Sequence, residues 1–380
     1  MSSPRTILFS AGESSGDQHA ANMFLALKKR DSTLKGIGMG GVKMRQVGIQ
    51  THYDSTNIGV IGVVEVLKQY TEIRRALKKI QQLILNQQPD LIVCVDYKEF
   101  NLKLAQFAKH HGFKVLFYVS PQVWAWRPKR VITYGKAIDM MAVIFPFETA
   151  YYEAENVPVR YVGHPSVDKV QPLRTQADDL KLFKLNPNAP IVGILPGSRT
   201  DEIKRILPVM VAAAKKIRHN HPTVQFILPQ ADSISDALLA PYVENTDIQV
   251  IKNQPYDVIQ CCDAIITTSG TATLEIALLT IPMVIVYKLS PLTYFLGRLL
   301  VNIKMIGLPN IIADKKIVRE LIQHQATCEN IAAEINKILT DHSYTQSIRT
   351  ELTQIKEKLG NGGGSENMAT LALEMLAETH

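Results

Sequence analysis

The chain has 380 residues, of which 46% are hydrophobic and 20% charged, so it can bury a large core, and its length favours two domains. The net charge of +7 favours an anionic partner (nucleic acid, acidic lipid or a phosphorylated substrate), although scattered lysines give the same sum. Four cysteines without a CxxC pair indicate reduced thiols in a cytosolic protein. The N-terminus does not resemble a signal peptide, and no apolar run reaches the roughly 18 residues of a membrane span.

Short apolar runs alternate with amphipathic stretches along the chain. In the first part we expect strands at 6–12, 90–96, 114–120 and 140–145, with helices at 18–30 and 68–88. A second series of expected strands lies at 189–198, 223–229, 263–270 and 281–288. This repeated alternation predicts an α/β fold of two doubly wound, Rossmann-like domains facing across a cleft, with sites at the carboxyl ends of the strands.

Pro-rich and Gly-rich segments mark the expected domain boundaries. The segment 163–179 is the expected hinge, which gives domains at 1–165 and 166–345 and a helical tail at 346–380. The string "LGNGGGS" at 359–365 predicts a flexible break before a short amphipathic helix. That helix would pack back on the first domain or on a partner chain; a surface helix on the second domain is the alternative.

The first turn, "AGESSGD" at 11–17, has the small residues of a phosphate-binding turn but carries carboxylates that repel phosphate. Farther on, "GIGMGG" at 36–41 has the glycine spacing of a dinucleotide motif. It lacks a good strand before it and an acidic residue at the required distance after it, so we expect no dinucleotide there.

An apolar run followed by a basic stretch occupies residues 57–79. Such a run is typical of docking on an acidic membrane surface, and a buried strand and helix would produce it equally well. The candidate membrane patch is formed by Ile61, Val63, Val64, Val66 and Leu67.

The string "VDYKEFN" at 95–101 places Asp96 at the carboxyl end of a strand, with Glu99 and Asn101 just beyond. A carboxylate there can take a proton from an attacking hydroxyl, or it can cap the next helix. In "YVSPQVWAWRPKR" at 118–130, Ser120 and both tryptophans precede a basic run that could bind a sugar, an acyl chain or a phosphate, or form core.

Two turns of the second half are suited to phosphate. In "LPGSRTDEIKRILP" at 195–208, Arg199 follows a strand and can pair bidentately with phosphate oxygens. In "TTSGTATLEIALL" at 267–279, hydroxyls and backbone N–H groups open a helix, one turn before a carboxylate that could bind a ribose diol; a capped helix with an early Glu is the alternative. The residues in question are Ser269, Gly270, Thr271, Thr273 and Glu275.

No Asp-x-Asp pair and no zinc-binding histidine spacing occurs, so we expect no metal and no other cofactor. The positive charge of Arg199 and of the helix N-terminus would then stabilise a departing diphosphate.

These motifs together resemble the lipid A disaccharide synthases, over nearly the whole chain. The strings "AGESSGD", "VDYKEFN", "YVSPQVWAWR", "LPGSRTDEI", "SGTATLE", "YKLSPLTYFLGRLL", "GLPNII" and "RELIQ" follow in that family's order. Two departures stand out: Tyr97, Lys98 and Glu99 replace the family's small residue, Pro and Asp, and "SS" replaces "AS" in the first turn.

The resemblance implies a glycosyltransferase of the GT-B type at the inner face of the inner membrane. It would join UDP-2,3-diacylglucosamine to the 6-hydroxyl of 2,3-diacylglucosamine 1-phosphate with inversion and release UDP. Asp96 would be the general base, the two phosphate turns would hold UDP, and Glu275 would hold the ribose. By the match to family motifs, Asn310, Glu320 and Gln323 would also bind the donor, whereas the acceptor would meet Gly12, Glu13, Ser15, Gly16, Asp17, Glu99, Asn101 and Ser120.

Two rival interpretations remain. Another UDP-sugar enzyme would share the nucleotide half, but the motifs of the first domain argue against it. A non-catalytic basic module that binds nucleic acid or membrane predicts clustered charges and interleaved aromatics, whereas the charges here are scattered. We therefore expect no nucleic-acid partner, an anionic membrane surface as a partner, and a homodimer through the tail as an open possibility.

Overall fold

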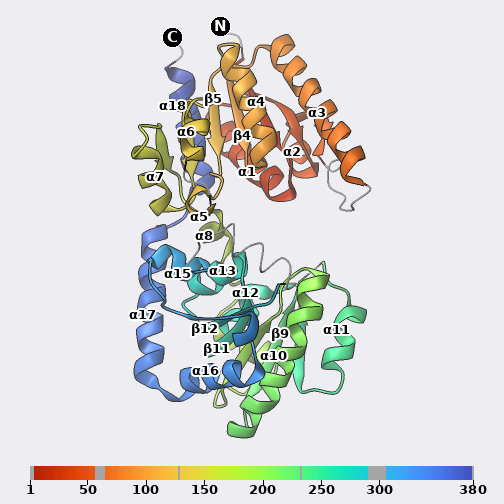
Figure 1. The fold of residues 1–380 in the computed structure, drawn as a ribbon, viewed down its shortest axis with the longest axis vertical. Coiled ribbons are helices and arrows are strands. Elements are labelled where there is room, and N and C mark those ends of the chain that lie inside the picture. Colours follow the sequence, from red (N-terminus) through yellow and green to blue (C-terminus); the bar gives the residue numbers. More distant parts are fainter. Residues whose placement is uncertain (1–3, 56–64, 127–128, 232, 290–304, 379–380) are drawn as a thin grey trace. The chain divides into compact units, whose positions relative to one another are not determined.

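The computed structural model describes residues 4–55, 65–126, 129–231, 233–289 and 305–378. The chain forms two compact units, here called unit 1 (Met1–Pro165 with Gly362–His380) and unit 2 (Ser166–Asn361). Each unit by itself is a parallel β-sheet flanked by helices, as the labelled ribbon shows (Figure 1).

Unit 1 contains a sheet of seven described strands in the order β3-β2-β1-β4-β5-β6-β7, all paired in parallel. The strands are β1 Thr6–Ala11, β2 Lys35–Gly40, β3 Gln50–Asp54, β4 Leu91–Val95, β5 Val115–Tyr118, β6 Met140–Val143 and β7 Val159–Tyr161. The helices are α1 Ser14–Arg30, α2 Val42–Gln46, α3 Glu65–Gln87, α4 Lys98–His110, α5 Val123–Trp126, α6 Arg130–Gly135, η2 Pro146–Glu148, α7 Thr149–Glu153 and α18 Gly364–Ala377.

The central strands of unit 1 are buried on both faces, which explains why they form continuous apolar runs in the sequence. Successive residues of β1 enter different cores: Leu8 packs in the cluster that includes α4, whereas Ile7 and Phe9 pack in the cluster that includes α1. Helix α18 also belongs to this second cluster, through Met368, Ala369, Leu371, Ala372, Met375 and Leu376.

Polar contacts fasten the tail helix α18 to unit 1. Arg30 of α1 donates to the Thr370 hydroxyl at 2.6 Å and pairs with Glu366 at 3.1 Å. The Asn367 amide donates to the carbonyl of Val162 at 3.0 Å. The segment expected as one tail is therefore divided, because the helix before the Gly-rich break belongs to unit 2 and α18 belongs to unit 1 (Figure 1).

Unit 2 contains six described strands in the order β10-β9-β8-β11-β12-β13, again all parallel. The strands are β8 Ile191–Leu195, β9 Gln225–Gln230, β10 Ile248–Lys252, β11 Ala264–Thr268, β12 Met283–Tyr287 and β13 Arg319–Ile322. The helices are α8 Pro165–Lys169 at the unit boundary, then α9 Gln176–Leu182, α10 Thr200–Asn220, α11 Asp236–Val243, α12 Pro255–Gln260, α13 Thr271–Leu278, α15 Leu308–Ala313, η3 Gln323–Gln325, α16 Cys328–Thr340 and α17 His342–Leu359.

The predicted fold class, two doubly wound α/β halves, is confirmed, and all eight expected strands are present. The four strands at the sheet edges, β3, β7, β10 and β13, were not predicted, because edge strands are partly solvated and lack a continuous apolar run. The interior strand β2 was not predicted either, because the string "GIGMGG" is itself most of this strand rather than a turn after one. No helix among the described residues is long and apolar enough to cross a membrane.

Candidate active site

In unit 2 the strand order reverses between β8 and β11, which lie side by side in the sheet. The chain leaves β8 toward β9 and leaves β11 toward β12, on opposite sides, so the carboxyl ends of this central pair form a crevice. The turns that follow these two strands are the two phosphate-binding candidates of the sequence, 196–199 and 269–271. The topology therefore brings together segments that are far apart in the chain.

A cavity of about 540 Å³ lies at this edge of unit 2. That volume is in the range of small-molecule and cofactor sites, roughly 300–1,000 Å³. Turns after β8, β9, β10 and β11 contribute to its lining. Five of the predicted donor residues line it, namely Arg199, Ser269, Gly270, Thr271 and Glu275.

The turn after β8 requires glycine at one position. Gly197 has φ +102°, and a Cβ atom there would lie 2.6 Å from Oε2 of Glu202. The Glu202 carboxylate can therefore lie against the turn, and it pairs with the Arg199 guanidinium at 3.1 Å. Because 81% of the Arg199 side chain is exposed, its guanidinium is available to a ligand in the cavity.

The turn after β11 also lines the cavity, beside the turn after the neighbouring strand β8. Helix α13 begins at Thr271, and the first N–H groups of a helix lack partners within it, so they favour an anion. The Ser269 hydroxyl donates to the carbonyl of Ile306 at 3.0 Å. Thr273 is fully buried and donates to the carbonyl of Gly270 at 2.8 Å, so it stabilises the turn and does not line the cavity.

Two buried polar atoms in cavity-lining residues, Oε1 of Gln230 and Oγ1 of Thr268, have no hydrogen-bond partner within the described ranges. The Gln230 amide nitrogen donates to the Ile234 carbonyl at 2.7 Å and to Asp236 at 2.8 Å, which fixes the orientation of the amide. Buried polar groups without partners are rare, so these two parts of the lining are suited to a polar ligand.

Glu275 lies in α13 beyond the anion-favouring first turn. Its Oε1 accepts a hydrogen bond from the Tyr256 hydroxyl at 3.0 Å and pairs with the Lys169 ammonium at 3.4 Å. Lys169 and Tyr256 also line the cavity, and sequence reasoning missed both. Their segments carry no glycine-rich turn or acidic motif, and only the fold brings them to Glu275.

Besides Thr273, the structure places three more predicted donor residues outside the cavity lining. Asn310 is fully buried, and its amide donates to Val318 and Glu320. Glu320 accepts from the backbone N–H groups of residues 306 and 307, while Gln323 exchanges two hydrogen bonds with the backbone of Leu289. In this structure these side chains hold the segments beside α15 and β12, and their role in donor binding stays a prediction.

Unit 1 has the same reversal of strand order, between β1 and β4. The turn that begins at Gly12 follows β1, and Asp96 follows β4 directly. Because sites in such sheets lie at the carboxyl ends of strands where the strand order reverses, both segments belong to one candidate site. Glu13 lies close enough to Asp96 for the two carboxylates to interact. The topology therefore brings the predicted base and the first-turn acid together.

Asp96 lies in a strained turn that one amide holds. Asp96 and Tyr97 have φ +48° and +47°, which is costly for residues other than glycine. The buried Asn101 amide donates to the carbonyls of Asp96 at 2.8 Å, Val95 at 3.2 Å and Ser10 at 3.0 Å, and its oxygen accepts from the Ser10 hydroxyl at 2.6 Å. Asn101 thus ties the ends of β1 and β4 together and fixes the backbone that carries Asp96.

The residue after Asp96 explains a glycine in the first turn. A Cβ atom on Gly12 would lie 2.2 Å from Cδ1 of Tyr97, so the Tyr97 ring occupies the space that any other residue at position 12 would need. Tyr97 also packs against Phe100, with ring centroids 5.3 Å apart. The residue by which this chain departs from the family motif is therefore part of the wall beside Asp96.

The two carboxylates of this edge are electrostatically coupled. Burial raises the pKa of Asp96, and the positive charge of Lys98 offsets part of that rise. Burial also raises the pKa of Glu13, the charge of Asp96 raises it further, and Lys98 acts in the opposite direction. A buried carboxylate with a raised pKa is a stronger base than an exposed one, as proton abstraction requires.

Asp17, a predicted acceptor residue, holds the start of α2 in the structure, and its contact with an acceptor stays a prediction. Its buried carboxylate accepts three backbone hydrogen bonds, from Gly41 at 2.7 Å, Lys43 at 2.9 Å and Met44 at 3.2 Å, at the start of α2. A Cβ on Gly41 would lie 2.7 Å from this carboxylate, and one on Gly40 2.1 Å from the Met44 sulfur. The glycines of "GIGMGG" therefore make room for Asp17 and Met44.

The remaining acceptor candidates differ in exposure. Ser15 is exposed in the first turn of α1, whereas Gly16 is buried. A Cβ atom on Gly16 would lie 3.3 Å from the carbonyl oxygen of Val95, which is a tight contact. Glu99 pairs with Arg130 at 2.5 Å and is 70% exposed. Ser120 is buried and shares a 2.7 Å hydrogen bond with the Tyr152 hydroxyl.

The membrane patch lies largely beyond what the structure describes. Ile61, Val63 and Val64 are outside the described residues. So are Arg127, the arginine of "VWAWR" in the string 118–130, and most of the string "YKLSPLTYFLGRLL". Val66 and Leu67 fall in the first turn of α3. The patch therefore stays a prediction.

Comparison with known proteins shows which family this chain resembles in sequence. A family model described as lipid-A-disaccharide synthetase matches residues 7–374. A lipid-A-disaccharide synthase of Geobacter sulfurreducens is 47% identical over 374 residues, which cover 98% of this chain and 97% of that protein.

Solved structures of low identity share the fold. A UDP-GlcNAc 2-epimerase of Neisseria meningitidis, bound to UDP-GlcNAc, matches with a TM-score of 0.63 at 13% identity, over 98% of this chain and 99% of that one. MurG of Acinetobacter baumannii matches with a TM-score of 0.61 at 12% identity, over 98% of this chain and 100% of that one. At such identities the likeness shows the fold alone.

We expect Asp17→Ala to lower the free energy of unfolding of unit 1 by about 3 kcal/mol, because three N–H groups beside α2 lose a charged acceptor. Both tryptophans lie in unit 1, so urea unfolding followed by tryptophan fluorescence measures this unit. The exposed Glu153→Ala is the control and should change stability by less than about 0.5 kcal/mol. Equal effects of the two substitutions would show that Asp17 does not stabilise the start of α2.

Proposed function

This chain belongs to the lipid-A-disaccharide synthase family, and from that membership and the two strand-edge sites we propose how it catalyses its reaction. It is a glycosyltransferase of lipid A biosynthesis that makes the lipid A disaccharide. The proposed donor is UDP-2,3-diacylglucosamine and the proposed acceptor 2,3-diacylglucosamine 1-phosphate, joined by a β-1,6 link.

The cavity of unit 2 is the observation that carries the assignment of the donor site. It combines an exposed guanidinium, the start of a helix and a carboxylate within one lining, supplied by Arg199, Thr271 and Glu275. These groups match the parts of a nucleoside diphosphate: cationic and N–H groups for the phosphates, and a carboxylate acceptor for a ribose hydroxyl.

The proposed chemistry is one direct displacement, which inverts the sugar. The 6-hydroxyl oxygen of the acceptor forms a bond to C1 of the donor sugar while the bond from C1 to the UDP oxygen breaks. UDP leaves with that electron pair, and the hydroxyl proton passes to the carboxylate of Asp96. The raised pKa of Asp96 favours this transfer.

Arg199 and the N-terminus of α13 would stabilise the charge that develops on the leaving diphosphate, so we propose that the reaction needs no metal ion. Among the residues that the structure describes, no group of three or more His, Cys, Asp or Glu side chains could hold a metal ion. Because that finding covers only part of the chain, the proposal rests on the positive groups of the cavity and is tested with a chelator.

We also propose that unit 1 binds the acceptor and that the enzyme works in the cytoplasm, on the inner face of the inner membrane. Substrates with several acyl chains require access to a membrane, and the run 57–79 has the apolar and basic residues for docking. We leave open a homodimer in which α18 packs on unit 1 of the partner chain instead of on unit 1 of its own chain.

UDP release tests the function directly. We expect release from UDP-diacylglucosamine only when diacylglucosamine 1-phosphate is present, and the same rate in excess EDTA. Asp96→Asn should lower this rate by about 10²- to 10⁴-fold with unchanged UDP affinity, because it removes a base and leaves the unit 2 cavity intact. The exposed Glu155→Gln is the matched control.

Release without the acceptor, or release that EDTA abolishes, would contradict the proposed reaction. A fully active Asp96→Asn variant would instead move the role of base to another group, with Glu13 next to be tested.

The charge of Lys98 predicts a pH effect. Lys98→Met removes a positive charge that lowers the pKa of Asp96, so that pKa should rise and ionised Asp96 should appear only at higher pH. The acidic limb of kcat/KM against pH should therefore move to higher pH. The exposed Lys103→Met, on the same helix, should leave the limb in place. A limb that stays fixed, or moves to lower pH, would show that it does not report Asp96.

Membrane docking predicts a loss of vesicle binding. Replacing Val63, Val64 and Leu67 together by Ser should reduce co-sedimentation with vesicles containing phosphatidylglycerol, because it removes apolar contact area. Leu182→Ser, at a 52% exposed apolar residue of unit 2, is the control. Unchanged sedimentation of the triple variant would remove the run 57–79 as the docking segment.

A further inference from the structure

Three cavity-lining side chains from three separate helices meet at one carboxylate oxygen. Lys169 belongs to α8, Tyr256 to α12 and Glu275 to α13. The Tyr256 hydroxyl donates to Oε1 of Glu275 at 3.0 Å, and the Lys169 ammonium lies 3.4 Å from the same oxygen. The ammonium also lies 5.8 Å from the centre of the Tyr256 ring.

The two oxygens of Glu275 are therefore not equivalent. Oε1 receives both donors, whereas Oε2 accepts no hydrogen bond in the portions of the chain that the structure describes. An ionised carboxylate has about four acceptor positions, two on each oxygen, so the two donors fill those of Oε1, while no described residue occupies those of Oε2. The Glu275 side chain is 16% exposed and lines the cavity, so a ligand there can reach it.

Both donors stay protonated around neutral pH. Burial lowers the pKa of Lys169, but hydrogen bonding with Tyr256 and the charge of Glu275 outweigh it, and the net change is upward. Burial raises the pKa of Tyr256, and the charge of Glu275 raises it further. The cluster is thus an anion held by one cation and one neutral hydroxyl.

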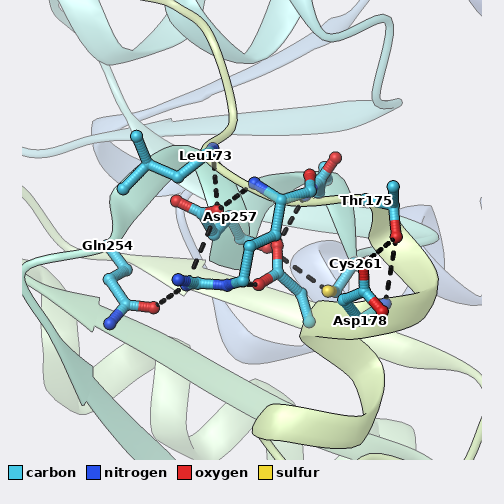
Figure 2. Close-up of polar contacts among 9 residues, drawn as sticks. Leu173, Thr175, Asp178, Gln254, Asp257 and Cys261 are labelled. Atoms are coloured by element: carbon cyan, nitrogen blue, oxygen red, sulfur yellow. Dashed lines mark hydrogen bonds and ion pairs between the residues drawn. The ribbon is translucent and has the colours of Figure 1, made fainter.

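A second network fixes the backbone that carries two of these side chains. Just after α8, the backbone N–H groups of Leu173 and Arg174 donate to Asp257, the neighbour of Tyr256, at 2.9 and 3.3 Å. The Arg174 guanidinium pairs with the buried Asp179 at 2.6 Å. Figure 2 shows the contact between Leu173 and Asp257 within this network. These hydrogen bonds therefore connect the segment after Lys169 to helix α12.

We propose that Lys169 and Tyr256 are positioning residues that hold Glu275 so that its Oε2 alone accepts a hydrogen bond, from one hydroxyl of the ribose of the bound nucleoside diphosphate. This inference rests on the proposed donor site and adds to it which oxygen binds the sugar and what orients it. A carboxylate with both oxygens free would bind the two neighbouring hydroxyls alike. With Oε1 occupied, the second of two neighbouring hydroxyls has no carboxylate oxygen of its own.

Deoxy analogues test the inference by calorimetry on the full chain. We expect the wild type to bind UDP and to lose about tenfold or more in affinity for either 2′-deoxy-UDP or 3′-deoxy-UDP, and less than about threefold for the other. Glu275→Gln should remove most of this difference. Lys169→Met and Tyr256→Phe should each weaken UDP binding and reduce the difference, because Glu275 is then free to turn.

Matched controls separate positioning from general damage. Lys181→Met and Tyr242→Phe, in the same unit and away from the cavity lining, should match the wild type. Lys169→Arg should restore most of the difference, since it keeps the cation. The effects of Lys169→Met and Glu275→Gln should not add in the double variant, whereas a lysine that binds the phosphates directly would give additive effects.

The outcomes distinguish the inference from the function on which it rests. Equal losses for the two analogues, or additive effects of the two substitutions, would overturn the inference while UDP binding upholds the donor site. A wild-type protein that unfolds cooperatively on heating but binds no UDP would overturn the proposed function and the inference with it.

Discussion

The reversal of strand order in each sheet is the constraint on which both candidate sites depend. A parallel sheet leaves uncovered carboxyl ends only where neighbouring strands send their connections to opposite sides, which here means β1 with β4 and β8 with β11. Asp96 follows one of these strands, and Arg199 and Ser269 come from turns after two others. The chemistry-bearing residues are thus placed by topology first and by local sequence second.

The sequence predicted what depends on short, strong patterns. Continuous apolar runs identified the central strands, because burial on both faces requires them, and the turns after these strands carried recognisable residues such as Asp96 and Arg199. Edge strands, which need no such run, were missed, and so was the interior strand β2, whose glycine-rich string is not apolar enough to indicate a strand. Lys169 and Tyr256 were missed for a different reason: their side chains matter through a shared contact with Glu275, which no local pattern records.

Several motif residues shape the backbone and do not face an open site. Gly12 makes room for the Tyr97 ring, and Gly41 for the Asp17 carboxylate, so two motifs that look like ligand-binding turns are explained in part by packing within unit 1. A glycine-rich string therefore indicates close approach, and only the structure says whether the approaching group is a ligand or a neighbouring side chain. In "GIGMGG" it is a side chain.

The strained backbone at Asp96 and Tyr97 connects the packing of unit 1 to the position of the Asp96 carboxylate. Two consecutive residues with positive φ would relax unless their surroundings opposed it, and Asn101 opposes it with hydrogen bonds to the ends of both central strands. The strained turn keeps the carboxylate of Asp96 at the strand edge, partly buried and with a raised pKa. The fully buried Asn101 therefore fits a positioning residue, which would act on the reaction through the backbone of the proposed base.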